Sequence, residues 1–231
     1  MLTEDWASLL EGTVPEVLSR IAAAAQRAGR DPDAVRLIAV TKTHPVVAVE
    51  AAVRAGVRDL GENRAADLAT KATAVPATWH FLGKLQSGTV RHVADHADVV
   101  HSAEPGGAVQ RLARRRAASH RLIEALIEVD FTGRRQGVGE DEALDFADAL
   151  AATEGLRLAG LMTIPPQTPE AARARPYFAK LRELSERLRD HHPGAAELSM
   201  GMSLDYEIGV EEGATMVRVG TALFGPRPAR G

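Results

Sequence analysis

The sequence contains no cysteine and no long apolar run. The absence of cysteine among its 231 residues excludes disulfides, thiolate nucleophiles and thiolate metal ligands. No apolar stretch approaches the ~20 residues that a membrane-spanning helix needs, so we expect no membrane partner. The N-terminal residues are acidic and lack the basic and apolar regions of a signal peptide, which predicts a cytoplasmic protein.

A strong excess of charge of one sign is also lacking. The net charge of −3 gives no reason to expect nucleic acid or an anionic membrane as a partner. The basic run Arg111, Arg114, Arg115 and Arg116 is interpreted as a solvated helix face. Histidine and carboxylate residues nowhere show the spacing of metal ligands, so we predict no metal site.

Short apolar strands alternate with helical segments along the whole chain. The first strand ends at Lys42, and the others are predicted at 57–60, 78–82, 98–101, 123–129, 156–164, 195–199 and 215–219. Helices are predicted at 14–28, 46–55, 84–94, 107–118, 140–151 and around 178–188, with a further alanine-rich helix that follows residues 61–64 and ends at about residue 74. Eight such units predict an α/β fold, a single (β/α)8 TIM-type barrel with an extra N-terminal helix, as one domain over 1–231. The alternative, an open doubly wound sheet, would usually carry a glycine-rich fingerprint after its first strand, where TKTHP stands.

The first strand ends on a lysine. In VRLIAVTKTHP (35–45), an apolar run rich in β-branched residues reaches Lys42 just before a His-Pro pair. A lysine at this place has its stem in the core and its amine at the mouth of a pocket. Burial disfavours an ammonium ion, so such an amine becomes available to form a Schiff base with a carbonyl. The alternative is a surface lysine that happens to follow a strand.

The last two predicted strands run into glycines beside hydroxyl residues. Strand seven leads into Ser199 and Gly201, and strand eight leads into Gly220 and Thr221. Such pairs let backbone N–H groups approach an anion, and barrels often bind phosphate there. In a closed barrel strand eight neighbours strand one, so this phosphate site would lie beside Lys42. A Schiff-base lysine beside a phosphate site is what pyridoxal 5′-phosphate (PLP) requires, although each glycine alone also fits a tight turn.

Other polar residues and methionines near these strand ends allow two interpretations each. Arg218 lies in an apolar strand and needs an anion or an acceptor, such as the PLP ring nitrogen, the phosphate, or a carboxylate such as Glu128. Asn63 is either a contact to the cofactor ring or a helix N-cap. His80 is expected to be a satisfied core histidine, and Met162, with Met200, is expected in the pocket wall.

Seven runs of the sequence match one protein family. They are AVTKTHP (39–45), LGENR (60–64), WHFLGKLQS (79–87), HSAE (101–104), GLMTIPP (160–166), LSMGMSLDYE (198–207) and MVRVGTALFG (216–225). Through them the chain resembles, over essentially its whole length, the YggS/PROSC-type PLP-binding proteins, also called PLP homeostasis proteins. The resemblance implies a barrel like the N-terminal domain of alanine racemase.

The resemblance also assigns roles to individual residues. It implies that Lys42 forms the Schiff base, that Ser199, Gly220 and Thr221 contact the phosphate, and that Arg218 lies near the cofactor ring. The sequence departs from the family pattern at Lys84, at 88–89 and in the loop 131–139. These departures concern the outer rim and any partner surface, and they leave the lysine and the phosphate site intact.

The function implied by the resemblance is that of a carrier. Such a protein holds PLP on Lys42 without substantial catalysis and supplies apo forms of PLP enzymes, and we expect a monomer. Racemisation would need a second acid–base group, and Tyr206 is the one conceivable candidate because Tyr177 belongs to an outer helix. The last motif ends six residues before the end of the chain, so we expect no further domain that could supply such an acid–base group. The alternatives are a PLP-dependent racemase or deaminase, or a barrel aldolase that uses Lys42 on a phosphosugar.

Overall fold

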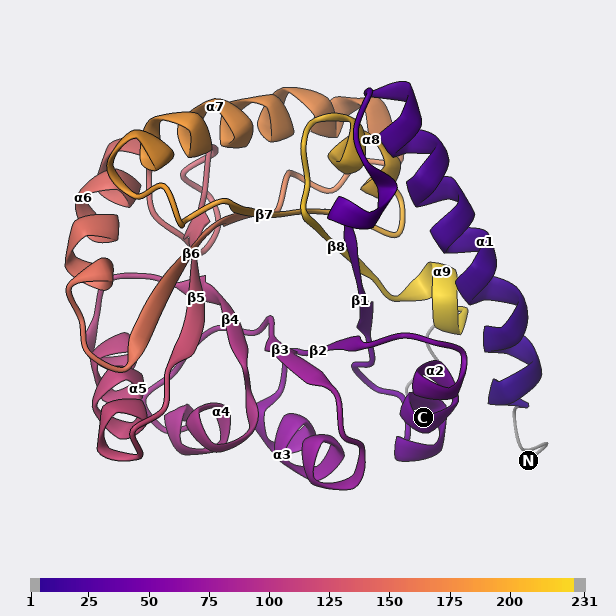
Figure 1. The fold of residues 1–231 in the computed structure, drawn as a ribbon, viewed down its shortest axis with the longest axis horizontal. Helices are drawn as coiled ribbons and strands as arrows, with labels where there is room; N and C mark the ends of the chain where they lie inside the picture. The colour runs from indigo at the N-terminus through magenta and orange to yellow at the C-terminus, as the bar shows by residue number, and fades with distance from the viewer. Residues whose placement is uncertain (1–4, 227–231) are drawn as a thin grey trace.

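The eight strands form one closed parallel barrel (Figure 1). The structure, a computed structural model, describes residues 5–226, so both ends of the predicted 1–231 domain lie outside it. The strands are β1 (Arg36–Val40), β2 (Asp59–Glu62), β3 (Thr78–Phe81), β4 (Val99–Ala103), β5 (Ile123–Val129), β6 (Leu156–Thr163), β7 (Glu197–Met202) and β8 (Met216–Val219). β8 pairs with β1 in parallel and closes the ring. The predicted TIM-type barrel is therefore confirmed.

Helices surround the barrel and cover its strands (Figure 1). They are α1 (Trp6–Arg27), α2 (Val46–Arg54), α3 (Ala65–Ala74), α4 (Val90–His96), α5 (Gly107–Ala118), α6 (Glu140–Ala151), α7 (Arg175–His191), α8 (Tyr206–Glu211) and α9 (Thr221–Phe224), with short 3-10 turns η1 (Pro32–Ala34) and η2 (Ala171–Ala174). The main apolar core lies between this layer and the strands. No helix within residues 5–226 is long and apolar enough to cross a membrane.

The extra helix α1 is longer than predicted. It begins at Trp6 rather than Val14, and the Asp5 carboxylate caps it by accepting a hydrogen bond from the Ser8 N–H at 3.1 Å. Pro15 lies inside the helix without ending it. Its buried stripe packs against α2, α8 and α9, beside the seam where β8 meets β1. The helix thus covers the part of the barrel from which Lys42 emerges.

Two helical details differ from the predictions. α4 begins at Val90 rather than Lys84. After β3 the chain stays at the end of β2, where the Leu82 N–H donates to the Glu62 carbonyl oxygen at 2.7 Å, and it then passes through Ser87 and Gly88, which favour turns. In α5, Arg116 is only 2% exposed and is not part of a solvated face. Its guanidinium donates to the carbonyl oxygens of Ala94, Ala97 and Leu122, which links the ends of neighbouring elements.

Candidate functional site

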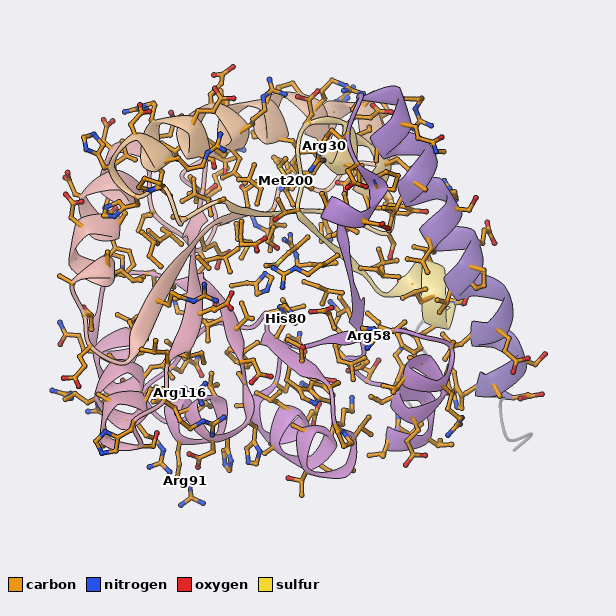
Figure 2. The ribbon with its side chains drawn as sticks, viewed as in Figure 1. Arg30, Arg58, His80, Arg91, Arg116 and Met200 are labelled. Carbon is orange, nitrogen blue, oxygen red and sulfur yellow. The ribbon has the colours of Figure 1, made fainter. Side chains whose placement is uncertain are left out.

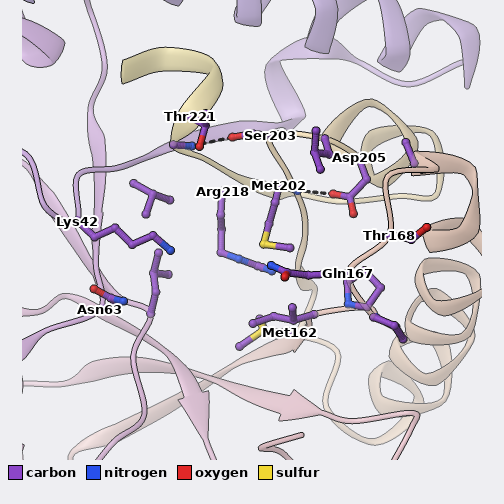
Figure 3. A pocket seen from close by; sticks show the side chains of 18 of the residues that line it. Lys42, Asn63, Met162, Gln167, Thr168, Met202, Ser203, Asp205, Arg218 and Thr221 are labelled. Atoms are coloured by element: carbon purple, nitrogen blue, oxygen red, sulfur yellow. Dashed lines mark hydrogen bonds between the residues drawn. The ribbon is translucent and has the colours of Figure 1, made fainter. Parts of the chain in front are cut away.

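A cavity of about 620 Å³ opens at the carboxyl ends of the strands (Figure 3). This volume lies within the usual range for small-molecule sites. Its wall includes side chains from the ends of β1, β2, β6, β7 and β8 and from the loop after β6. Of the predicted site residues, it is lined by Lys42, Asn63, Met162, Arg218, Gly220 and Thr221.

Lys42 is displayed by a tight turn directly after β1. The His44 N–H donates to the Thr41 carbonyl oxygen at 3.1 Å, and Thr43 between them has a φ of 71°. A β-branched residue rarely adopts this left-handed conformation, and such local strain is found at functional sites. Figure 3 shows the partly exposed Lys42 side chain extending into the cavity.

A buried ion pair holds the base of this turn. The Lys71 ammonium donates to the Glu62 carboxylate and, at 2.8 Å, to the Thr41 carbonyl oxygen. The Thr41 hydroxyl donates to the same carboxylate at 2.7 Å. Glu62 is fully buried and Lys71 is 5% exposed, so the pair is shielded from water. Sequence reasoning missed this pair, although Glu62 lies in the motif LGENR.

The ends of β7 and β8 meet through the hydroxyl of Ser203. Its Oγ accepts hydrogen bonds from the Gly220 N–H at 3.1 Å and the Ala222 N–H at 3.3 Å. Asp205 shapes the same loop, because its carboxylate accepts from the Met202 N–H at 2.6 Å. Two backbone amides therefore already point at an oxygen acceptor in the cavity wall, beside the exposed side chain of Thr221.

Gly201 suits this loop because a side chain there would be strained. Its φ is 92°, and a Cβ at this position would lie 2.8 Å from the Tyr206 Cα. The end of β7 thus packs directly on the start of α8, which directs the Ser203 hydroxyl toward β8.

The structure does not place Ser199 at the cavity, contrary to its predicted role as a phosphate contact. Ser199 is fully buried within β7, and its Oγ lies 2.5 Å from Arg218 Nη1 and 2.8 Å from His101 Nδ1. The reason is depth along the barrel axis, since Ser199 lies inside the strand and Ser203 beyond its end. Of the two serines of the motif LSMGMSLDYE, Ser203 lines the cavity.

Arg218 lines the cavity and is 5% exposed (Figure 3). Besides Ser199, its guanidinium donates to the Thr163 carbonyl oxygen at 3.0 Å. Burial lowers the pKa of Arg218 to about 10, although Glu128 and Asp205 act in the opposite direction, so the side chain is a cation near pH 7. Burial also raises the pKa of Glu128 to about 7, against the attraction of Arg218. Glu128 accepts its hydrogen bond from Gln136 at 2.9 Å.

The structure also shows where the other candidate residues lie. Asn63 is not the N-cap of α3, because Arg64 occupies that position without a side-chain hydrogen bond. His80 is a satisfied core histidine, as expected, with its ring nitrogens 2.9 Å from Asp59 Oδ1 and from His101 Nε2. Met162 lines the cavity, whereas Met200 belongs to the main core.

Several residues of the cavity wall were not among the predicted site residues. They include Gln167 and Thr168 in the loop after β6, and Met202 and Leu204 near the end of β7. The adjoining motif GLMTIPP was the available sequence signal for the first of these. Within residues 5–226, no group of three or more histidine, aspartate or glutamate side chains could hold a metal ion.

Proteins of known sequence resemble this chain along nearly its whole length. Residues 16–228 match the family described as alanine racemase, N-terminal domain. The pyridoxal phosphate homeostasis protein of Pseudomonas aeruginosa is 42% identical over 225 residues, which cover 95% of this chain and 96% of that protein. The pyridoxal phosphate homeostasis protein of Aquifex aeolicus is 35% identical over 217 residues, covering 91% of this chain and 95% of that one.

Solved structures share the architecture. PipY of Synechococcus elongatus, determined with PLP bound, is 36% identical and superposes with a TM-score of 0.79, covering 90% of this chain and all of that one. Alanine racemase of Corynebacterium glutamicum is 19% identical with a TM-score of 0.65 over 93% of this chain and 62% of that one, a likeness of fold. With its barrel, its cavity and these full-length relatives, the chain belongs to the pyridoxal phosphate homeostasis protein family, whose barrel is of the alanine racemase N-terminal type.

Proposed function

We propose that this protein binds PLP in the cavity at the carboxyl ends of the strands and serves as a carrier in PLP homeostasis. One observation supports this most strongly. Lys42 extends into a cavity whose wall also contains Arg218, Gly220 and Thr221. The relatives that are named for PLP homeostasis match 95% and 91% of this chain.

The residues of the cavity fit the chemical groups of PLP. The aldehyde of PLP forms a Schiff base with a lysine amine and releases water. Lys42 would supply that amine. The N–H groups of Gly220 and Ala222 now donate to the Ser203 Oγ, and a bound phosphate would replace that oxygen as their acceptor. The hydroxyls of Ser203 and Thr221 would then donate to the phosphate.

The remaining wall would hold the cofactor ring. A guanidinium has only hydrogen-bond donors, so Arg218 would donate a hydrogen bond to an unprotonated ring nitrogen. Asn63 and Met162 would contribute polar and apolar contacts to the ring. These three assignments complete the set of cofactor contacts that we propose together with Lys42.

The same wall favours holding over catalysis. Neither Tyr177 nor Tyr206 lines the cavity, and Tyr206 is 2% exposed in the main core, where burial raises its pKa. Racemisation needs an acid–base group on each face of the bound amino acid, with a pKa near the working pH. An arginine at the ring nitrogen also disfavours protonation there and weakens the electron sink that most PLP chemistry uses.

Two further titratable groups of the wall are engaged elsewhere. His44 stacks on Phe224 with 4.7 Å between ring centroids and meets the edge of Trp6 at 5.3 Å. Asp205 accepts from the loop backbone at Met202. We therefore propose that the protein releases PLP to apo forms of PLP enzymes rather than converting amino acids. That it acts as a monomer remains a prediction from the sequence.

The decisive experiment is reduction of the loaded protein with borohydride. Wild-type protein should gain a visible absorbance band with PLP, and reduction should fix the cofactor on the peptide that contains Lys42. Lys42→Ala should remain folded and lose this adduct, whereas Lys84→Ala, which changes an exposed lysine outside the cavity wall, should keep it. An adduct of unchanged yield in Lys42→Ala would refute the assignment.

A second assay separates carrier from enzyme. Loaded protein is mixed with L- and D-amino acids, and racemisation and keto-acid formation are followed beside transfer of PLP to an added apo-enzyme. We expect transfer without turnover. A turnover number near 1 per second or above, lost in Lys42→Ala, would favour the racemase or deaminase alternative.

A further inference from the structure

A chain of hydrogen bonds runs through the inside of the barrel and ends at the cavity. It begins at Asp59, whose Oδ1 lies 2.9 Å from His80 Nε2, and continues through His80 Nδ1 to His101 Nε2 at 2.9 Å. His101 Nδ1 lies 2.8 Å from Ser199 Oγ, which lies 2.5 Å from Arg218 Nη1. The two histidines and the serine are fully buried, and Figure 2 shows His80 within the ring of strands.

When both histidine rings are neutral, the chemistry of the two ends fixes the direction of every bond. Arginine can only donate, and an ionised carboxylate can only accept. Ser199 therefore accepts from Arg218 and donates its own hydrogen to His101 Nδ1. His101 is then neutral and donates from Nε2 to His80 Nδ1, which leaves His80 to donate from Nε2 to Asp59. Every hydrogen in this chain has an acceptor.

The opposite direction leaves a group unsatisfied. A doubly protonated His80 would donate to His101 Nε2, and His101 Nδ1 would donate to Ser199. Ser199 would then accept twice, and its hydrogen would have no acceptor among the hydrogen bonds of the described residues. A buried hydroxyl in this state costs free energy. Burial, followed by repulsion from His80 and Arg218, also lowers the pKa of His101 well below 6.5, which agrees with a neutral ring.

We infer that Asp59, His80, His101 and Ser199 form a one-way hydrogen-bond chain that positions the Arg218 guanidinium at the cavity. Ser199 holds Nη1 from behind and the Thr163 carbonyl holds Nη2 at 3.0 Å, so two anchors fix the guanidinium. None of the four members of the chain lines the cavity, so they are positioning residues. A donor that is already held in place loses less conformational freedom when the PLP ring binds, so this chain should strengthen PLP binding. That consequence rests on the proposed function.

The direction of the chain can be tested without any cofactor. Long-range ¹H–¹⁵N correlation spectra of cofactor-free wild-type protein at pH 7 should show His80 and His101 both protonated at Nε2 and unprotonated at Nδ1. In Ser199→Ala, the His101 Nδ1 resonance should shift, since its donor is gone. Either ring in the other tautomer, or doubly protonated, would overturn the inference.

Positioning is tested with PLP itself. Ser199→Ala should weaken PLP binding about three- to tenfold, the value of one hydrogen bond, and should shift the absorbance maximum of the bound cofactor. Ser185→Ala is the matched control, because it also deletes a buried serine hydroxyl, on α7 and away from the cavity. Equal affinity and an equal spectrum in the two variants would refute the positioning role.

The two levels of the hypothesis can fail separately. If the wild-type protein binds no PLP, the proposed function is wrong, and the tautomers in the cofactor-free protein still decide whether the chain exists. If Ser199→Ala does not fold, the wild-type spectrum decides in the same way.

Discussion

The buried pair Glu62–Lys71 allows the sharpest test of how the Lys42 turn is built. In Lys71→Met the methionine fills the apolar path of the lysine stem, but the Glu62 carboxylate keeps only the Thr41 hydroxyl at 2.7 Å and the Asn63 N–H at 3.3 Å. Removing one partner of a buried pair costs about 3–5 kcal/mol, because the other charge stays in a site without water.

This magnitude is large enough for a simple assay. For a domain of this size, each kcal/mol lowers the melting temperature by roughly 2–4 °C, so Lys71→Met should melt about 6–20 °C below wild type. The matched control is Lys84→Met, since Lys84 pairs with Glu104 at 3.2 Å with its side chain 52% exposed. Such an exposed pair contributes about 0–1 kcal/mol, so this variant should melt within a few degrees of wild type.

A double substitution separates the buried charge from lost packing. Glu62→Gln combined with Lys71→Met removes both charges and keeps an acceptor for the Thr41 hydroxyl, so it should be more stable than Lys71→Met alone. Because Lys71 also holds the Thr41 carbonyl, Lys71→Met should give a lower yield of the borohydride-fixed adduct. If Lys71→Met melts no lower than Lys84→Met, the pair is not buried in solution and the reasoning is refuted.

Three other predictions concern the cavity wall and the charge behind it. Thr221→Val should weaken PLP binding about ten- to a hundredfold, the value of a charge-assisted hydrogen bond, and a fluorescence titration that shows equal affinity would contradict the phosphate assignment. Burial raises the pKa of Glu128 from 4.5 to about 7, so between these pH values the folded state keeps a proton that the unfolded state loses. The stability of the wild type therefore falls as the pH rises through this range, by about 3 kcal/mol at most. Glu128→Gln should therefore be stabilised relative to wild type more at pH 8 than at pH 5 in thermal melts, and an equal difference at both pH values would be contrary evidence. Gly201→Ala should cost about 1–3 kcal/mol and weaken PLP binding, because its Cβ would lie 2.8 Å from the Tyr206 Cα, whereas Gly194→Ala, with open space around it, should change neither.

The order of strands and helices was accessible from the sequence because it depends on local patterns. Short β-branched runs alternate with amphipathic segments, and eight such units have few ways to bury their apolar faces. The position of Lys42 follows from the same pattern, since the end of an apolar strand is visible in the residues themselves. Glycine beside a hydroxyl at 220–221 likewise marked the end of β8, and both residues line the cavity.

The tertiary structure decided which of several equivalent residues reaches the cavity. Ser199 and Ser203 belong to one short motif, and only the depth of β7 in the barrel separates the buried serine from the one that meets the N–H groups of Gly220 and Ala222. Arg116 shares a basic run with its neighbours, yet its guanidinium is the one that reaches buried carbonyl groups of α4 and the following segment.

The polar interior of the barrel was also invisible to local patterns. Five strands contribute to it, with Asp59, His80, His101, Ser199 and Arg218. These strands surround one interior only because β8 pairs with β1 and closes the barrel. Glu62 and Lys71 meet because α3 packs back on the end of β2. Hydrophobic periodicity reports which face of an element is buried, whereas the partner of a buried charge is set by the three-dimensional packing of elements, and no short-range pattern in the sequence encodes it.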